Sequence, residues 1–453
     1  MTEYSSGLFY NKSDLKMKLY TLGGYNEVGK NMTAIEVRDE IIILDMGYNV
    51  EELIGMENPV ESTATKNLIH SGVIPNDKII YRQREKVKGI VIGHGHLDHV
   101  GAVAKMAGSY NCPIFASPYT MKIVEEQIQQ DNKEVKNERI VLEPGKIHNL
   151  TSKFAIEFVK VTHSIPDTML TVLHTPEGRV AYGLDFRIDR SPVLGGTVDF
   201  DRLEKIGSEG LKILVGDSTR VADRGVSSTE SSVKEHLQFR FDQLYDDRSA
   251  IVVTTFSSHI ERLKSILEVN SGRRKVAFIG RSLKDYTQPA EDLGYLNLKD
   301  IEIASYRDEV NDLFEKIGEN REEWLIVCTG NQGEENSVLE RLSKDQYPFQ
   351  LQEGDHVIFS SSTIPTLINK ADRYRLEKNL KKKDVNLHLD IHASGHGHRE
   401  DLRLLIQTLK PEIMIPGHGD IHKLAEHAKL AQEEGYKLNE NLFICENGNV
   451  LEF

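Results

Sequence analysis

The chain has 453 residues, a formal net charge of −14 and 39% hydrophobic residues, a composition typical of a soluble globular protein. Its length predicts two or more domains with ample core, and the lack of an 18-residue apolar run excludes a membrane span. The acidic balance disfavours nonspecific binding to polyanions, although a metal site and a local basic groove can dominate the field where a substrate binds.

The compartment is indicated by the N-terminus and by the cysteines. Residues 1–20 lack the apolar segment of a signal peptide. The cysteines Cys112, Cys328 and Cys445 are odd in number and form no CxxC pair. We therefore expect reduced, buried thiols in a cytoplasmic protein.

Strand and helix patterns alternate along the chain. The first half predicts an opening β-meander and further strands at 19–24, 33–37, 40–45, 87–92, 111–115, 154–161 and 212–215. The second half predicts strands at 251–255, 275–279 and 324–329, separated by helical patterns such as 259–269. That order is typical of parallel βαβ units and predicts an α/β domain inserted into another domain.

The run from His94 to His99 (HGHLDH) packs four metal-competent side chains into six residues. It follows the apolar strand pattern 87–92 and precedes residues 100–107, which read as the start of a helix. Three imidazoles and one carboxylate are a ligand set that zinc prefers. The run therefore predicts a metal site on a strand-to-helix loop, where α/β folds place their active sites.

Three further ligand candidates stand at the ends of other predicted strands: His163, Asp185 and His418. With them the sequence supplies two groups of ligands. We expect one ion on His94, His96 and His163, a second on Asp98, His99 and His418, and Asp185 bridging both because a carboxylate has two oxygens. Two adjacent ions acidify a shared water and hold the attacking and leaving oxygens of a phosphoryl group.

This ligand set resembles that of the metallo-β-lactamase superfamily, and further motifs resemble the ribonuclease J family of its β-CASP group. The motifs are VTHSIPD at 161–167, GDST at 216–219, GRS at 280–282, TGNQGE at 329–334, FSSSTIP at 359–365 and HASGH at 392–396. The resemblance implies a metallo-β-lactamase αββα sandwich formed by residues 1–217 and 373–453, with a β-CASP α/β domain inserted at 218–372. It also implies the shorter, archaeal type of the family, because bacterial members carry an additional C-terminal domain.

The resemblance further implies a ribonuclease that degrades 5′-monophosphorylated single-stranded RNA from 5′ to 3′ in RNA decay and maturation, with possible endonucleolytic cuts. Two zinc ions, or manganese or magnesium, would hold the attacking hydroxide. His396, with Asp98 and Asp185, is expected to take part in catalysis, and Asp217 to orient a metal-ligand imidazole. A helix N-cap is an equally weighted alternative for Asp217.

Small polar residues at two strand ends suit a terminal phosphate. They are Gly330, Asn331, Gln332, Gly333, Ser360, Ser361 and Ser362. The HASGH residues Ser394 and Gly395 are expected to contact substrate beside His396, whereas His392 would only support their loop. Phe256 could stack on a base, although core packing is slightly favoured. The family usually has serine at the position of Asn331, so a hydroxyl contact there is in doubt.

Several alternatives stay open. The chain could act mainly as an endonuclease in RNA processing, or could be a β-CASP relative from RNA 3′-end processing or DNA repair. It could also be another metallo-β-lactamase-fold hydrolase or a catalytically inactive binding subunit. The basic segment 373–384 is either a solvated helix face or a nucleic-acid contact, at even weight. We expect a homodimer and no membrane partner.

Overall fold

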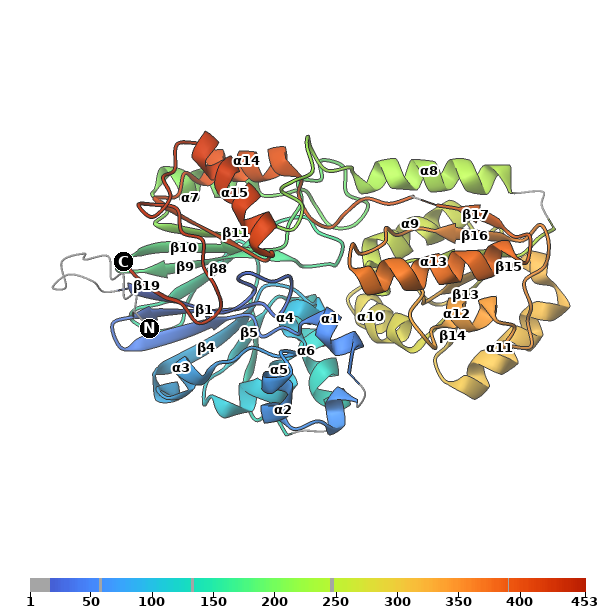
Figure 1. Ribbon diagram of the computed structural model, residues 1–453, viewed down its shortest axis with the longest axis horizontal. Coiled ribbons are helices and arrows are strands. Elements are labelled where there is room, and N and C mark those ends of the chain that lie inside the picture. The colour runs from blue at the N-terminus through green and yellow to red at the C-terminus, as the bar shows by residue number, and fades with distance from the viewer. Residues whose placement is uncertain (1–16, 57–58, 132–133, 245–247, 390) are drawn as a thin grey trace, which may run out of the picture.

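The computed structural model describes residues 17–56, 59–131, 134–244, 248–389 and 391–453. Three β-sheets organise this part of the chain, two in one lobe and the third in a second lobe (Figure 1). The first lobe is a sandwich whose two sheets face each other between outer helices. The predicted α/β sandwich with an inserted α/β domain is confirmed.

The first sheet has seven strands in the order β19-β1-β2-β3-β4-β5-β6. Its opening three strands form the predicted antiparallel meander, and β3 to β6 run parallel. The strands are β1 (Met17–Gly23), β2 (Met32–Val37), β3 (Glu40–Leu44), β4 (Val87–Ile92), β5 (Ile114–Ala116), β6 (Arg139–Val141) and β19 (Val450–Glu452).

The second sheet has six strands in the order β18-β11-β10-β9-β8-β7. These strands are β7 (Ile147–Asn149), β8 (Ala155–Lys160), β9 (Met169–Thr175), β10 (Gly178–Gly183), β11 (Ile213–Asp217) and β18 (Ile413–Gly417). Because β11 pairs in parallel with both β10 and β18, the carboxyl ends of these three strands meet at one edge. Asp185, Asp217 and His418 lie at or just beyond those ends.

Helices cover both outer faces of the sandwich (Figure 1). One layer consists of α1 (Val50–Ile54), α2 (Thr65–His70), α3 (Lys78–Tyr81), α4 (Leu97–Val100), α5 (Val103–Met106) and α6 (Pro118–Asp131). The other consists of α7 (Phe200–Ser208), α14 (Arg399–Leu409) and α15 (Ile421–Glu433). No described helix is long and apolar enough to cross a membrane, and the three cysteines are buried and unpaired as predicted.

The third sheet is parallel throughout, in the order β14-β13-β15-β12-β16-β17. Its strands are β12 (Ile251–Thr254), β13 (Lys275–Ile279), β14 (Ile301–Ala304), β15 (Trp324–Cys328), β16 (His356–Phe359) and β17 (Asn386–His388). Its helices are α8 (Glu230–Gln243), α9 (Ile260–Asn270), α10 (Arg281–Asp292), α11 (Arg307–Glu319), α12 (Val338–Ser343) and α13 (Leu367–Lys381).

The structure moves the end of the inserted domain beyond residue 372. That residue lies inside α13, whose Leu376 and Leu380 are buried in the core of the third sheet. The following strand β17 then pairs with β16. We therefore place the return to the sandwich after His388, because apolar burial and strand pairing hold residues 373–388 in the inserted domain.

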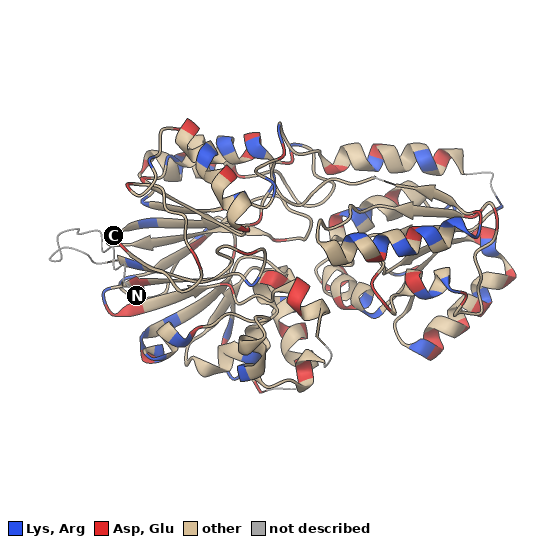
Figure 2. Ribbon diagram, viewed as in Figure 1, with Lys and Arg blue, Asp and Glu red and all other residues tan. Residues whose placement is uncertain are grey.

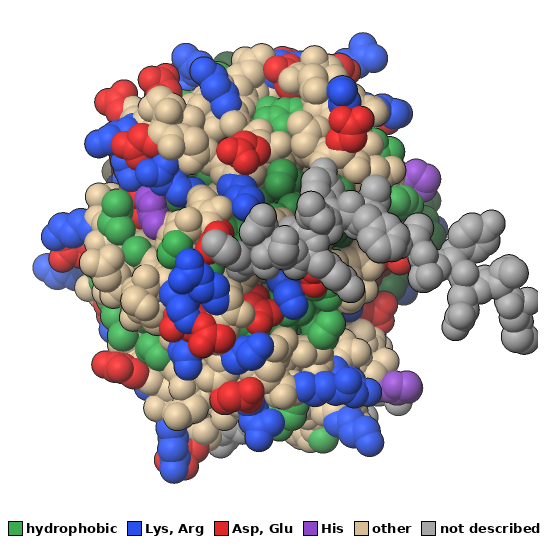
Figure 3. Space-filling view, turned by 90° about the vertical axis from the view of Figure 1, so that its left-hand side faces the viewer, with side chains coloured by type: hydrophobic (Ala, Val, Ile, Leu, Met, Phe, Trp, Pro, Cys, Tyr) green, Lys and Arg blue, Asp and Glu red, His purple; other side chains and the backbone are tan. Residues whose placement is uncertain are grey.

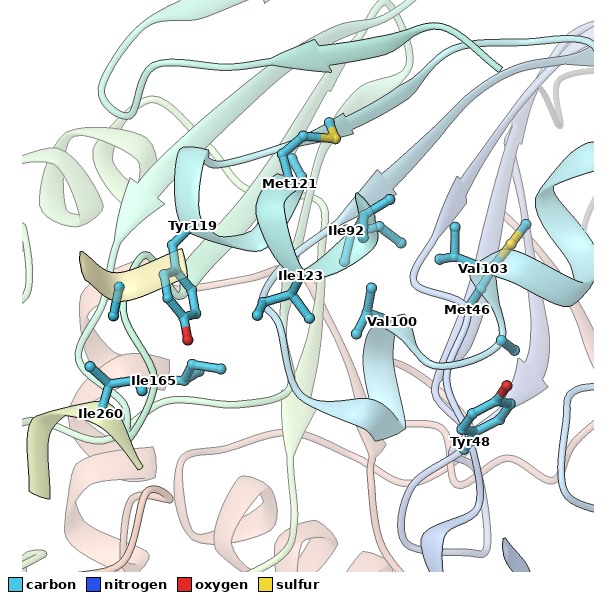
Figure 4. Packing of buried hydrophobic residues seen from close by; sticks show 14 of the residues in the cluster. Met46, Tyr48, Ile92, Val100, Val103, Tyr119, Met121, Ile123, Ile165 and Ile260 are labelled. Atoms are coloured by element: carbon cyan, nitrogen blue, oxygen red, sulfur yellow. The ribbon is translucent and has the colours of Figure 1, made fainter. Parts of the chain in front are cut away.

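The two lobes share a hydrophobic core next to the ligand loop. Tyr119 and Ile123 on α6 and Ile165 from the 163–167 loop belong to the same buried cluster as Ile260 on α9 (Figure 4). The Tyr119 hydroxyl also donates to the carbonyl of Tyr286 on α10, at 2.8 Å. The inserted domain is thus packed against the side of the sandwich that carries the predicted ligands.

Candidate active site and metal centre

The ligand loop begins where the buried strand β4 ends at Ile92. The loop packs closely against α6, since a Cβ added to Gly95 would lie only 3.0 Å from a side-chain carbon of Ile123. A Cβ on Gly47 would lie 1.6 Å from the carbonyl oxygen of Asp98. Close packing on both sides therefore fixes the loop.

A first ligand group combines His94, His96, His163 and Asp185, with their ligand atoms within 4.8 Å of one another. The Nδ1 atom of His96 lies 3.2 Å from Nε2 of His94 and 3.0 Å from Nε2 of His163. The Oδ2 atom of Asp185 lies 3.4 Å from Nε2 of His94 and of His163. Burial lowers the pKa of His96 to about 3 and that of His163 well below its usual value, so both rings stay neutral and keep a lone pair for a metal.

A second group combines Asp98, His99, His418 and the other oxygen of Asp185. The Oδ1 atom of Asp185 lies 3.0 Å from Nε2 of His99 and 3.4 Å from Nε2 of His418. The Oδ2 atom of Asp98 lies 3.6 Å and 3.5 Å from the same two nitrogens. Asp185 thus turns one oxygen to each group, as a bridging ligand must.

The donor set fits two divalent cations. Asp185 Oδ1 is buried and has no hydrogen-bond partner among the described residues, although imidazole nitrogens surround it. Burial lowers the pKa of His99, but the carboxylates of Asp185, Asp98 and Asp45 outweigh it and raise that pKa well above its usual value. A proton therefore occupies His99 when no metal is bound, and a metal ion would replace it.

Contacts behind the ligands orient their rings. Asp45, directly after β3, lies with Oδ2 2.7 Å from Nδ1 of His99, and its other oxygen accepts from the amide of Gly93 at 2.9 Å. His163 Nδ1 lies 2.5 Å from the carbonyl oxygen of Gly395. The amide of Gly29 lies 3.2 Å from Nδ1 of His418. Such partners fix ring orientation and, for His99 and His163, hold Nδ1 so that Nε2 points toward Asp185.

His396 lies beside the ligand groups but pairs with a different carboxylate. Its Nδ1 is 2.8 Å from Oδ2 of Asp217, and its Nε2 is 3.6 Å from Oδ2 of Asp185. Burial lowers the pKa of His396, yet Asp217 and Asp185 outweigh it and raise that pKa to about 9. These two carboxylates therefore favour the protonated imidazole, whose Nε2 faces the ligand groups.

The role expected for Asp217 is corrected by these contacts. Its carboxylate orients His396 rather than a metal-ligand imidazole. Its Oδ1 accepts from both the amide and the hydroxyl of Thr219, at 2.8 Å each. No helix begins there in the described chain, since a turn follows β11, so the N-cap alternative is wrong.

Two fully buried arginines hold the loop that carries His396. Arg187 from the sandwich donates to the carbonyl of Ser394 at 3.0 Å, and Arg262 on α9 donates to that of Ile391 at 3.2 Å. Buried carboxylates neutralise them: Glu261 lies 2.8 Å from Arg187, and Glu230 lies 2.6 Å from Arg262. The loop is therefore fixed by charges from both lobes.

The two loops expected to hold a 5′-phosphate are joined to each other. Gln332 donates to Asn331 Oδ1 at 2.6 Å and to the carbonyl of Ser362 at 2.9 Å. Ser360 donates to the carbonyl of Ile391 at 3.1 Å. The side chains of Gln332 and Ser360 therefore already form hydrogen bonds within the protein. The Ser361 hydroxyl, by contrast, is buried without a hydrogen-bond partner among the described residues.

Phe256 and His392 lie beside one another. Phe256 is half-buried. Its ring lies 6.3 Å from that of His392, whose Nδ1 is buried and unpartnered within the described chain. Burial holds the pKa of His392 well below its usual range, so the ring is neutral.

Sequence reasoning missed the groups that act behind the site. Asp45, Arg187 and Arg262 were assigned no role. The position of Asp45 could have indicated a role at the site, because it directly follows the buried strand β3, just as Asp217 stands at the end of β11. Nothing in the local sequence distinguishes the two arginines, because their partners come from distant segments.

Comparisons with known proteins agree with this architecture. Family models match the metallo-beta-lactamase superfamily at residues 25–182, the ribonuclease J beta-CASP domain at 248–373 and a Zn-dependent metallo-hydrolase RNA specificity domain at 384–442. A solved structure from Enterococcus faecalis V583, of unknown function, shares the fold with a TM-score of 0.68 at 17% identity, over 97% of this chain and 100% of that one.

Relatives match along nearly the whole chain. Ribonuclease J of Methanocaldococcus jannaschii is 40% identical over 97% of this chain and 99% of that protein. Ribonuclease J of Pyrococcus abyssi is 39% identical over 96% and 97%. The chain therefore belongs to the ribonuclease J family of β-CASP metallo-β-lactamase nucleases.

Proposed function

We propose that this ribonuclease removes nucleotides from 5′-monophosphorylated single-stranded RNA in the 5′→3′ direction, with internal cleavage as a second activity, in RNA decay and maturation. The observation that carries phosphodiester hydrolysis is the position of His396, which Asp217 holds with its Nε2 3.6 Å from the Asp185 carboxylate that lies between the two ligand groups.

The ligand groups and His396 have separate roles in this proposal. His94, His96 and His163 with Asp185 would hold one divalent ion, and Asp98, His99 and His418 with Asp185 the other. The ions, which we take to be zinc, would acidify the attacking water and stabilise charge on the phosphate. His396 Nε2 would donate a hydrogen bond, and finally its proton, to a phosphate or leaving oxygen, and Asp217 would stabilise the imidazolium before transfer.

Recognition of the 5′ end is supported by polar atoms without partners. Buried polar groups are almost always hydrogen-bonded, yet the Ser361 hydroxyl and His392 Nδ1 have no such partner among the described residues. A 5′-phosphate and its nucleotide would satisfy them, with Phe256 free to contact the base. A terminal triphosphate, being longer and more charged, would fit a closed pocket poorly.

The test uses one RNA labelled separately at its 5′ and 3′ ends, each prepared as monophosphate and as triphosphate. We expect monophosphorylated RNA to release a 5′-labelled mononucleotide first and the triphosphate to block this route. A ladder shortened from the 3′ end and indifferent to the 5′ group would refute the polarity. Discrete internal fragments from both RNAs would instead favour the endonuclease.

We also propose a cytoplasmic homodimer. Three unpaired buried cysteines suit a reducing compartment. Sedimentation velocity of the metal-loaded enzyme measures the oligomeric state directly, and a monomer at all concentrations would exclude the dimer.

A further inference from the structure

The outward face of α13 is strongly basic, although the chain as a whole is acidic. One side of the helix is buried in the inserted domain, through Asn369, Arg373, Leu376 and Leu380. At 100° per residue, the opposite side presents Leu367, Lys370, Tyr374, Arg375, Lys378, Lys381 and Lys382, all exposed. We call these seven residues the α13 basic face. It contains five cations and no acid.

The acidic residues of α13 lie on its flanks and leave most of this charge free. Asp372 pairs with Arg375, and Glu377 pairs with Arg373 at 2.8 Å and with Lys381 at 3.9 Å. Lys370, Lys378 and Lys382 form no ion pair in the described part of the chain. By contrast, α15 pairs its lysines with acids of the same segment, as Lys429 does with Glu426.

Large apolar side chains are interleaved with these lysines. Tyr374 is 68% exposed and Leu367 is 86% exposed. Lys370, Tyr374, Lys378 and Lys382 form a row at four-residue spacing, about 6 Å per step along the axis. A solvated helix does not need an exposed aromatic ring within a row of cations. Single-stranded nucleic acid uses both, because lysines meet phosphates and aromatic rings stack on bases.

The helix is also built into the loops next to the catalytic lobe. Arg373 donates to the carbonyl of Asn331 at 2.7 Å, and Gln332 accepts from the amide of Ile364 at 2.7 Å. Basic residues line α13 in Figure 2, whereas acidic and basic side chains are interspersed over the far end of the sandwich (Figure 3). Positive charge within the inserted domain is thus concentrated on α13.

From these observations we propose that the α13 basic face is a binding track for the part of a single-stranded RNA that lies outside the catalytic site. The track rests on the RNA substrate proposed above but not on the direction of degradation. Its chemistry is that of phosphate pairing with Lys370, Lys378 and Lys382 and base stacking on Tyr374. The contact is not sequence-specific, because every base has a stacking face.

The test compares RNA lengths in the triple variant K370Q/K378Q/K382Q. All three side chains are exposed, so the fold should be unaffected. For an unstructured RNA of about 20 nucleotides, we expect Kd to rise about 10- to 100-fold at ~0.1 M salt and the salt slope to fall by about 2, since each phosphate contact on a single strand contributes ~0.7. A 5′-phosphorylated dinucleotide should keep its kcat and KM, because it cannot occupy the catalytic site and the track together.

The matched control is K66Q/K205Q/K410Q, which removes equal charge from exposed lysines of the sandwich. Binding is measured in metal-loaded H396A protein, with and without the triple change, to prevent cleavage.

Tyr374→Ala should weaken binding of the long RNA with little change in salt slope. An equal loss of long-RNA affinity in the control variant would contradict the proposed track. So would an equal loss of activity on the dinucleotide, or an unchanged Kd of the triple variant for the long RNA. So would a change in sedimentation coefficient without a change in RNA affinity, which would assign the face to a second copy of the chain. None of these results depends on cleavage polarity, so they are independent of the exonuclease assay.

Discussion

The charge of Asp217 controls the protonation of His396, and replacing Asp217 with asparagine tests this. The D217N substitution keeps the size of the side chain and removes its charge, and its single amide oxygen can accept either from His396 Nδ1 or from the Thr219 amide, each of which lies 2.8 Å from an oxygen of Asp217. The neighbouring carboxylates raise the pKa of His396 to about 9 against the burial that lowers it. Asp217 is the larger of the two charges acting on the ring, so its loss should return the pKa to 6.5 or below.

The size of the effect follows from the fraction of protonated His396. At pH ~7.5, an imidazole with a pKa of about 9 is ~97% protonated, whereas one with a pKa of 6.5 is ~9% protonated. If His396 acts as a proton donor, the single-turnover rate of D217N should fall about 10-fold at that pH. The protonated form is lost as pH rises through the pKa, so the alkaline limb of the rate profile should move about 2.5 pH units lower, and activity should recover on acidification.

The assay is single-turnover cleavage of 5′-monophosphorylated RNA between about pH 5.5 and 9.5, at equal metal content confirmed by elemental analysis. Both proteins are compared at the same metal content, so the shift between their profiles isolates the charge of Asp217. Coinciding wild-type and D217N profiles would refute the assignment of His396 as a proton donor. Loss of metal in D217N would show that Asp217 supports the ligands instead.

Four further changes probe metal binding, catalysis and the shared core. His96→Ala should abolish cleavage and reduce bound metal while circular dichroism stays unchanged, because this ligand lies on a loop. His396→Ala should keep both ions and slow single-turnover cleavage about 10²–10³-fold, the usual effect of losing one transition-state donor. Arg262→Ala should lower the free energy of unfolding in urea by about 3–5 kcal/mol, because it leaves the buried Glu230 with only the more distant His259 and Arg187 as cationic neighbours. Gly47→Ala should weaken metal binding, measured by calorimetric titration, because the new Cβ would lie 1.6 Å from the carbonyl oxygen of Asp98.

Each change has a control of the same kind. His422→Ala and Arg375→Ala remove exposed side chains, and Gly108→Ala adds a Cβ with no atom within 4 Å. Active enzyme with only trace metal would exclude the metal site. Loss of an ion from H396A would show that His396 is a metal ligand. If Arg262→Ala lowered the free energy of unfolding no more than Arg375→Ala does, Arg262 would not stabilise the core. Unchanged metal affinity in G47A would show that the loop can shift to accept the new Cβ.

The ligand set and the fold class could be predicted from the sequence. His94, His163 and His418 each follow a run of strand-forming residues, and the strands that precede them, in two facing sheets, end on the same side of the sandwich. The local sequence therefore predicted both the chemistry of these side chains and their positions at strand ends. The alternating strand and helix patterns in the second half likewise predicted the parallel third sheet.

Contacts between distant segments were decided only by the tertiary structure. The pattern of residues 373–388 shows a helix and a strand but not which sheet they join, and pairing of β17 with β16 places them in the inserted domain. Asp217 could be placed at a strand end, yet its choice of His396 over a metal ligand depends on a residue 179 positions away. Local propensity and periodicity act over a few residues, whereas burial and charge pairing depend on where the chain returns in space.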